Sequence, residues 1–243
     1  MSFPIRFWTF VVNALCLPLH VIHALGLYKL YKRVTPFLFQ RISANYNKRM
    51  RDCKAELFRG LPAFKKPGGG QLTLLEIGCG TGANFEFFPP ACRVICTDPN
   101  PHFQNYLTEN VKKNDHLKYE KFVVATGEDM SSVEDESVDA VVCTLVLCTV
   151  TDIPQTLREA HRILRPGGAF FFLEHVVAEP STWSYFFQHV FQPVWYYFGD
   201  GCRVTRPTWK YLEEAGFSDL KLKHIQAPLV FMIKHHIFGH AVK

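Results

Sequence analysis

A glycine-rich turn carries the clearest chemical signal in this sequence. The apolar residues 72–77 predict a strand, and the turn GCGTG at 78–82 follows directly, with Glu76 just before the first glycine. Glycine tolerates positive φ, and because it has no Cβ a ligand can lie against the main chain. A strand, such a turn and then a helix beginning near Ala83-Asn84 are typical of a nucleotide-type cofactor site. The main chain at Gly78, Gly80 and Gly82 is therefore expected to lie against such a cofactor.

A second carboxylate follows the next predicted strand. Residues 92–97 form an apolar run that ends at Asp98. A carboxylate at the tip of the second strand can accept hydrogen bonds from both ribose hydroxyls of a nucleoside. Sites for NAD use the same arrangement, so Asp98 indicates a nucleoside cofactor without identifying it. The alternative is that residues 98–101 (DPNP) form only a turn and a helix cap.

The order of the motifs resembles that of class I S-adenosylmethionine-dependent methyltransferases. The glycine turn has the spacing GxGxG after an acid, rather than the GxGxxG of dinucleotide sites. Residues 137–143 (SVDAVVC) are similar to the fourth strand of those enzymes, and LRPGG at 164–168 before the strand 169–173 is a further diagnostic element. The resemblance implies S-adenosylmethionine as the cofactor. It also implies that the residues binding this cofactor are Glu76, Gly78, Gly80, Gly82 and Asp98.

This resemblance implies roles at two more strand ends. The third predicted strand, 120–125, leads to Glu128 and Asp129, and an acidic side chain in this loop is expected to accept a hydrogen bond from the adenine amine. The sequence does not decide between the two acids. The end of the fourth strand, residues 144–148, is expected to line the cleft between the sulfonium and the substrate, with Thr144 and Leu145 as cofactor contacts.

Candidate residues on the substrate side follow the fifth predicted strand. His175 stands at the tip of that strand and is the best candidate for a general base, although it could instead hydrogen-bond only within its loop. Asp200 and Cys202 are weaker candidates for substrate contact. Without clustered acids or paired CxxC spacing, the sequence predicts no metal site.

Nine aromatic residues fall between residues 183 and 198, after the fifth strand. They could line a lipophilic substrate pocket, enter a membrane or pack in the core.

Helix and strand patterns supply the framework for these residues. Asp152 is placed to cap a helix that ends at the LRPGG segment, and a capped helix is expected over 205–217. Two late strands, 219–225 and 236–242, match the hairpin that completes a methyltransferase sheet. The predicted fold is therefore α/β and Rossmann-like, with a seven-stranded, mostly parallel sheet and a C-terminal antiparallel hairpin.

Composition and charge limit the functional classes. Of 243 residues, 48% are hydrophobic and 20% charged, as in a folded chain. The net charge is +5, but residues 29–66 alone hold eleven Lys or Arg and two acids, so the rest is acidic. Such a local basic block argues against a nucleic-acid-binding protein. The eight cysteines show no disulfide framework, which fits a reducing compartment.

The N-terminus predicts a membrane attachment. Residues 7–28 carry no formal charge, and a basic flank follows them. Internal Asn, Pro, His and Gly residues leave open whether this segment spans the bilayer or lies in one leaflet. A cleaved signal peptide and a buried core helix are the alternatives. Because the positive charge follows the segment, the catalytic domain is expected to face the cytosol.

A basic amphipathic helix is expected next, over residues 36–60. Its predicted polar face carries Arg41, Lys48, Arg49, Arg51 and Lys54, and it could lie on an anionic membrane or pack on the domain. The predicted organisation is a membrane anchor at 1–35, the basic helix and a linker at 36–70, and the methyltransferase domain at 71–243.

Over nearly its full length the chain resembles the small membrane-associated methyltransferase-like proteins assigned as alkyl thiol S-methyltransferases. The resemblance rests on the N-terminal apolar segment and on LLEIGCGTGANFEFFPPACRV, DPNPHF, VVCTLVLCTV, LRPGGAFFFLEHV, DGCRVTR and HAVK. It implies methylation of small lipophilic thiols or hydrogen sulfide, and residence at the endoplasmic reticulum membrane or on lipid droplets. Membrane lipid is the implied partner, and the oligomeric state stays open.

Two other functions compete with this interpretation. One is a methyltransferase that acts on carbon or oxygen of a lipid or quinone, since it would share the same motifs. The other is a non-catalytic membrane scaffold that retains the fold.

Overall fold

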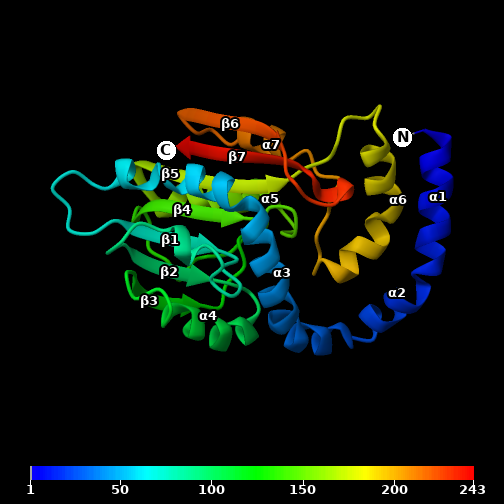
Figure 1. The fold of residues 1–243 in the computed structure, drawn as a ribbon, viewed down its shortest axis with the longest axis horizontal. Coiled ribbons are helices and arrows are strands. Elements are labelled where there is room, and N and C mark those ends of the chain that lie inside the picture. The colour runs from blue at the N-terminus through cyan, green and yellow to red at the C-terminus, as the bar shows by residue number, and fades with distance from the viewer. Residues whose placement is uncertain (1) are drawn as a thin grey trace.

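Seven strands form one mixed sheet in the computed structural model, which describes residues 2–243 (Figure 1). In spatial order the strands are β3 (Lys118–Val123), β2 (Arg93–Thr97), β1 (Thr73–Ile77), β4 (Val138–Thr144), β5 (Leu164–His175), β7 (His235–Val242) and β6 (Asp219–Gln226). The first five are parallel to one another, whereas β7 runs antiparallel to both β5 and β6. The predicted seven-stranded sheet with an antiparallel C-terminal hairpin is confirmed.

Helices cover both faces of this sheet. Successive strand residues point to opposite faces, so Leu74 and Phe171 pack with the core on one face, and Leu75 and Phe170 with the core on the other. The first core includes side chains of α3 (Tyr28–Phe58) and α4 (Gln104–Val111), and the second includes those of α5 (Ile153–Ile163) and α7 (Thr208–Glu213). Strands buried on both faces explain the nearly continuous apolar runs in the sequence.

The strand order reverses beside β1, and this reversal positions the site. The chain passes from β1 outward to β2 and β3, then crosses back to β4 on the other side of β1. In open α/β sheets, ligands bind outside the carboxyl ends of the strands at such a switch point. The residues after β1, β2 and β4 therefore share one edge of the sheet.

Two of the expected helices are shorter in the structure. The helix expected from Ala83-Asn84 is only a 3-10 turn at Phe85–Phe87, because two prolines at 89–90 prevent its continuation and hold Phe88 extended. The helix expected over 205–217 is limited to α7, since the carbonyl of Arg206 accepts a hydrogen bond from the amide of Val177 and is tied to the segment after β5. The Asp152 cap is confirmed, with its side chain accepting from the amide of Gln155.

Helix α3 contains most of the helix expected over residues 36–60. It begins at Tyr28, and one side of its second half joins the core under the sheet. Lys54 lies on that buried side, although it was expected on the basic face. Pro36, expected at the start of a helix, lies inside α3. The division of the chain at residues 36 and 71 stays a prediction.

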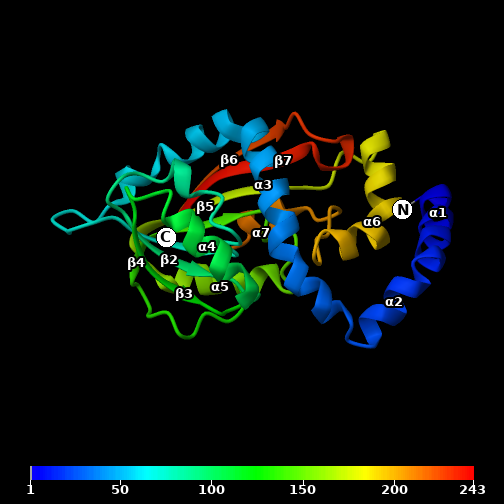
Figure 2. The same cartoon turned by 60° about the horizontal axis from the view of Figure 1, so that its bottom comes forward.

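The N-terminal arm consists of α1 (Phe3–Leu15) and α2 (Leu17–Ala24), and it lies at the end of the molecule away from the sheet (Figures 1 and 2). Helix α1 runs beside α6 (Trp183–Phe198), and Thr9 donates to the carbonyl of His189 there. Within residues 2–243 no single helix is long and apolar enough to cross a membrane, but α1 and α2 pass that test together as a pair bent by 56°. The uncharged run 7–28 is thus not one continuous helix.

Candidate active site

Glu76 is buried at the carboxyl end of β1. Its Oε1 accepts a hydrogen bond of 2.6 Å from Nδ2 of Asn84, while Oε2 is buried and has no hydrogen-bond partner among the described residues. Burial raises the pKa of Glu76 to about 7. A buried carboxylate oxygen without a donor is costly, and the ammonium group of a bound S-adenosylmethionine would provide one. The position fits the expected cofactor.

Asn84 organises this end of the cleft. Its Nδ2 also donates to the hydroxyl of Thr144 at 2.9 Å, and its Oδ1 accepts 2.7 Å from Nζ of Lys54. Lys54 also donates to Oδ1 of Asn47. Burial lowers the pKa of Lys54 to about 8, although the negative charge of Glu76 acts to raise it. The network connects α3 to β1 and β4, so three elements hold the predicted cleft residue Thr144 in place.

Each glycine of the turn has a backbone conformation that other residues adopt only at a cost in free energy. Gly78, Gly80 and Gly82 all have positive φ, of 61°, 52° and 76°. A Cβ on Gly78 would lie 2.5 Å from Cγ2 of Val146, so only glycine lets the turn approach the loop after β4. At Gly80 a Cβ would meet nothing closer than Phe103 at 3.8 Å, which leaves the main chain there accessible to a ligand.

Asp98 lies at the tip of β2, facing the glycine turn. Its two carboxylate oxygens accept from the amide of Gly80 at 3.0 Å and from the amide of Asn100 at 2.8 Å. Each oxygen can accept a second hydrogen bond, as a ribose diol requires. Burial raises the pKa of Asp98 to about 6. The hydrogen bonds from the two amides and the charge of Lys32 oppose this increase, whereas the charge of Asp200 adds to it. Asp98 is held in the position expected for a ribose ligand.

The loop after β4 curves over the cofactor turn. Leu145 has a φ of 58°, which a non-glycine residue rarely adopts. Glu174, at the end of β5, accepts hydrogen bonds from the amides of Val146 and Leu147 through Oε1 and fixes this curve. The predicted cleft residue Leu145 therefore stands at a strained bend, directly after Thr144.

The two candidate adenine-loop acids already have local partners. Glu128 accepts from the amide of Thr151 at 2.5 Å, near the start of α5, and exposed Asp129 accepts from the amide of Ser131. Both carboxylates thus stabilise turns in the structure. The adenine role of either residue stays a prediction.

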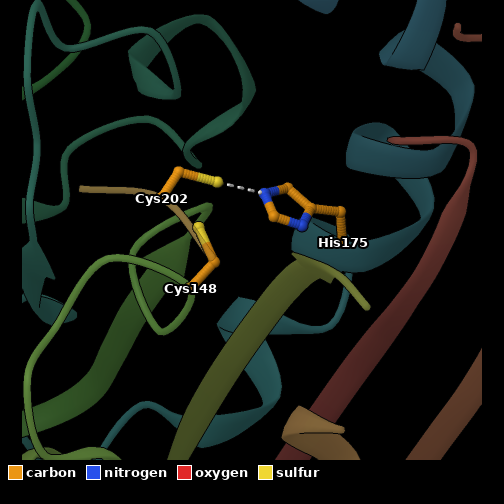
Figure 3. Close-up of side chains that lie close together, drawn as sticks. All are labelled: Cys148, His175 and Cys202. Atoms are coloured by element: carbon orange, nitrogen blue, oxygen red, sulfur yellow. Dashed lines mark hydrogen bonds between the residues drawn. The ribbon is translucent and has the colours of Figure 1, made fainter. Parts of the chain in front are cut away.

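A cluster of sulfur and imidazole groups lies beyond this bend (Figure 3). Cys148, His175 and Cys202 are buried, and their Sγ and ring nitrogen atoms lie within 4.8 Å of one another. Nε2 of His175 is 3.0 Å from Sγ of Cys202, which also accepts a hydrogen bond of 3.1 Å from the indole of Trp195. The thiol of Cys148 is 3.5 Å from the carbonyl of Leu145.

The cluster changes the acidity of its members. The Cys148 thiol, followed by the His175 ring and the Trp195 indole, lowers the pKa of Cys202 well below its usual value against the effect of burial. Burial alone would lower the pKa of His175, but the charge and hydrogen bond of Cys202 raise it. Cys202 occupies Nε2, so His175 could act as a general base only after that contact opens or through Nδ1, which has no hydrogen-bond partner among residues 2–243. That role stays a prediction.

Asp200 belongs to the boundary between the cofactor cleft and the N-terminal arm. It accepts a hydrogen bond from the hydroxyl of Tyr28 and forms an ion pair with Lys32, both at the start of α3. The carbonyl of Lys32 in turn accepts from Nδ2 of Asn100, next to Asp98. These contacts make Asp200 a positioning residue for the start of α3, and none of them indicates proton transfer.

The aromatic segment forms α6, and none of its aromatic side chains is fully buried. All nine are partly or fully exposed, and they are Trp183, Tyr185, Phe186, Phe187, Phe191, Trp195, Tyr196, Tyr197 and Phe198. Trp195 packs against the small buried cluster of Cys148, Cys202 and Val204, whereas Trp183 is 75% exposed at the other end of the helix. Core packing therefore accounts for Trp195 in part, and a substrate or membrane contact stays a prediction for the exposed aromatic residues.

The sequence predicted Cys148 at the end of the cleft-lining stretch 144–148 and Trp195 among the aromatic residues of a possible substrate pocket. It gave no site role to Lys54 or to Asn84, although Asn84 lies only two residues after the last glycine of the turn. The meeting of Cys148 with His175 and Cys202 carried no signal, because these residues are far apart in the chain and share no spacing motif.

Comparison with known proteins gives strong similarity over most of the chain. Residues 75–172 match the family described as a methyltransferase domain. The human thiol S-methyltransferase TMT1A is 54% identical over 221 residues, which cover 90% of this chain and 90% of the human protein. The human thiol S-methyltransferase TMT1B is 47% identical over 235 residues, with 96% of each chain covered.

Solved structures share the fold with much lower identity. The [4+2]-cyclase SpnF is 16% identical with a TM-score of 0.61, covering 89% of this chain and 94% of that one. A geranyl diphosphate methyltransferase, solved with GPP and sinefungin, is 17% identical with a TM-score of 0.58, covering 80% and 78%. At such identities the likeness shows the fold alone.

Proposed function

This chain belongs to the thiol S-methyltransferase family of S-adenosylmethionine-dependent methyltransferases, and we propose that it methylates the sulfur of small lipophilic alkyl thiols, or hydrogen sulfide, at a membrane surface. The observation that carries the proposal is the 54% identity to human thiol S-methyltransferase TMT1A across 90% of both chains. The arrangement of the site supports it in three respects.

The first support is the cofactor side. S-adenosylmethionine supplies a methyl group on a sulfonium, which a nucleophile takes by in-line displacement. Asp98 can accept the ribose hydroxyls, Gly80 offers an open main chain, and the unpaired Oε2 of Glu76 can accept from the ammonium group. These residues hold the methyl donor at the edge of the sheet where β1, β2 and β4 end.

The second support is the chemistry that a thiol requires. A few per cent of a free thiol is already thiolate at neutral pH, and sulfur is intrinsically nucleophilic. The enzyme must mainly align it and remove its proton. The buried groups of Cys148, His175 and Cys202 lie beside the cleft and suit a sulfur substrate better than a phenol, which needs a strong base.

The third support is the apolar surface of the N-terminal arm and α6. Large hydrophobic side chains are exposed along α1, α2, the first half of α3 and α6, and they include Phe3, Phe7, Trp8, Phe10, Leu15, Leu17, Leu25, Leu30, Phe37, Ile42, Trp183, Phe191 and Phe198. An apolar surface of this extent favours contact with a membrane. Helix α6 would then bring a lipophilic substrate from the membrane toward Trp195.

We also propose a location for the protein. The basic residues Lys29, Lys32 and Arg33 follow the N-terminal arm, which favours a catalytic domain on the cytosolic side. The resemblance to membrane-associated thiol methyltransferases supports the endoplasmic reticulum membrane or lipid droplets. Imaging of the tagged full-length protein, together with markers of the endoplasmic reticulum and of lipid droplets, tests this location.

A panel of acceptors tests the substrate. Full-length protein in lipid vesicles is incubated with methyl-labelled S-adenosylmethionine and, separately, with aliphatic thiols, hydrogen sulfide, phenols and quinols. We expect label in the aliphatic thioethers, increasing with chain length. Label only in phenol, quinol or lipid products would instead support the carbon or oxygen methyltransferase. Cofactor binding without transfer to any acceptor would support the scaffold.

A further inference from the structure

Three soft metal ligands converge at the cluster of Cys148, His175 and Cys202 from separate parts of the fold. Cys148 lies after β4, His175 ends β5, and Cys202 follows α6. All three are buried, and their ligand atoms lie within 4.8 Å of one another (Figure 3). No disulfide joins the two cysteines in the described structure.

We propose that these residues bind a zinc ion, and that its fourth coordination position takes the substrate thiol. The proposal rests on the thiol S-methyltransferase function proposed above. Two cysteines and one histidine form a ligand set that zinc uses in catalytic sites, where a fourth position stays open. Two sulfur ligands favour zinc over magnesium or calcium, which prefer oxygen.

The spacing of the groups suits a metal ion between them. With zinc–sulfur bonds of about 2.3 Å and zinc–nitrogen bonds of about 2.1 Å, tetrahedral ligand atoms lie about 3.6 Å apart. The 3.0 Å contact between His175 and Cys202 must therefore widen by a few tenths of an ångström. Among residues 2–243, no group hydrogen-bonds the buried Nδ1 of His175, so the ring can move without losing another hydrogen bond there.

The surroundings of the cluster support a bound thiolate. The indole of Trp195 donates to Sγ of Cys202, and a donor to a ligand sulfur is typical of the outer shell of metal sites. Near the cluster, Arg206 donates to the carbonyl of Leu147, the residue before Cys148. The cluster therefore has one side-chain N–H donor to a ligand sulfur, the Trp195 indole, and a cationic side chain nearby that binds the adjoining main chain.

The two cysteines of the cluster lie close in the chain to residues beside the cofactor site, as the proposed reaction requires. Val146, two residues before Cys148, packs against Gly78 of the cofactor turn. Asp200, two residues before Cys202, pairs with Lys32 beside the ribose-binding Asp98. Both cysteines thus follow segments that border the cofactor cleft.

The chemistry balances without a further reactant. Two ligand thiolates neutralise the charge of the zinc ion. The substrate thiol replaces a water ligand, its sulfur bonds to zinc, and its proton passes to solvent, because a thiol that coordinates zinc is deprotonated. Its sulfur then takes the methyl group, so that a thioether and S-adenosylhomocysteine leave and water returns to the zinc.

Cobalt substitution tests the site with a spectroscopic readout. Full-length protein, kept reduced, is stripped of metal with a chelator and titrated with Co²⁺. We expect one equivalent to bind, with a thiolate-to-cobalt charge-transfer band and the visible bands of tetrahedral cobalt. An alkyl thiol added without S-adenosylmethionine should shift the visible bands, since it enters the coordination sphere.

Matched variants locate the metal. Cys202→Ser should weaken zinc binding by more than the roughly ten- to hundredfold typical of an outer-shell change. Cys92→Ser, at an equally buried cysteine outside the cluster, should bind zinc normally. Retained binding of S-adenosylmethionine by Cys202→Ser shows that this variant is folded. If it does not fold, Trp195→Phe should still shift the cobalt charge-transfer band.

Several outcomes would overturn the proposal. These are the absence of the cobalt bands, bands unchanged by thiol, equal zinc affinity in both cysteine variants, or a disulfide between Cys148 and Cys202 in unreduced protein by mass spectrometry. If metal-free protein methylates thiols at the full rate, the zinc site is wrong but the proposed function stands. If zinc binds and no thiol is methylated, the proposed function is wrong as well.

Discussion

At the scale of single residues, Asp98 is the side chain that we propose to bind the ribose of the cofactor. Its carboxylate is oriented by the amides of Gly80 and Asn100 and keeps free lone pairs for ligand hydroxyls. Asp98→Asn keeps the size of the side chain but removes the charge and one acceptor. A hydrogen bond to a charged group contributes about 1.5–3 kcal/mol, so we expect S-adenosylmethionine affinity to fall about ten- to hundredfold.

Isothermal titration calorimetry measures this change. Asp115→Asn, at an exposed aspartate away from the site, serves as the control and should bind normally. Equal affinity of Asp98→Asn and Asp115→Asn would show that Asp98 only caps its turn.

The acidity of Asp98 also predicts a pH dependence of cofactor binding. Burial raises its pKa to about 6, so acidification protonates it and removes an acceptor for the ribose. If only the ionised form binds, affinity should fall about tenfold from about pH 7.5 to about pH 5. The protonation of Glu76, whose pKa burial raises to about 7, should add to this decrease. Calorimetry over this range should show a smaller decrease for Asp98→Asn than for the unchanged protein.

The same groups affect stability in the opposite sense. Both carboxyls have a higher pKa in the folded chain than their ordinary values, so the folded state holds protons that the unfolded chain has lost. Their contribution to the free energy of unfolding is full below their ordinary pKa and is lost as pH rises through about 6 and about 7. Denaturation of cofactor-free Glu76→Gln should show a weaker pH dependence in this interval; an unchanged slope would contradict the assignment.

At the scale of elements, the approach of the glycine turn to the loop after β4 is the tightest constraint. A Cβ on Gly78 would lie 2.5 Å from Val146, whereas one on Gly68, with a similar φ of 69°, would meet nothing within 4 Å. Gly68→Ala should therefore cost only the strain of positive φ, roughly 1–2 kcal/mol. Gly78→Ala should cost about 1–3 kcal/mol more because of the added overlap.

Urea denaturation of both variants without cofactor compares their free energies of unfolding. If Gly78→Ala lowers the free energy of unfolding no more than Gly68→Ala does, β4 and its loop must move away from the added Cβ without cost.

At the scale of the whole molecule, the N-terminal arm places a large apolar surface at the end away from the sheet (Figure 2). We expect the triple variant Phe3→Ser, Phe10→Ser and Leu15→Ser to lose membrane binding. Full burial of such a side chain contributes about 1.5–3 kcal/mol, so each change should lower vesicle partitioning about tenfold or more. Because the three side chains are 72–80% exposed, the fold should be unaffected.

Flotation with phospholipid vesicles measures the bound fraction. Val124→Ser, which removes an exposed apolar side chain from the sheet end, is the matched control and should still float. If the triple variant floats like the unchanged protein, the basic side of α3 or α6 must provide the attachment.

Local sequence patterns were enough to predict the sheet, and together with the family resemblance they predicted the cofactor. Glu76, the three glycines and Asp98 are local in the chain, because each follows the strand that positions it, and parallel strands bring their carboxyl ends to one edge. Local patterns also predicted the Asp152 cap, since a cap and its partner are three residues apart.

Features that depend on contacts between distant segments could not be predicted without the folded structure. Lys54 belongs to an apparently basic helix face, yet α3 packs that side against Asn84 and the core. Cys148, His175 and Cys202 share no spacing motif and meet only because β4, β5 and the segment after α6 converge at one end of the sheet. The distance between these residues along the chain does not predict that they come into contact. Their contact is set by how the elements pack and not by local backbone preference.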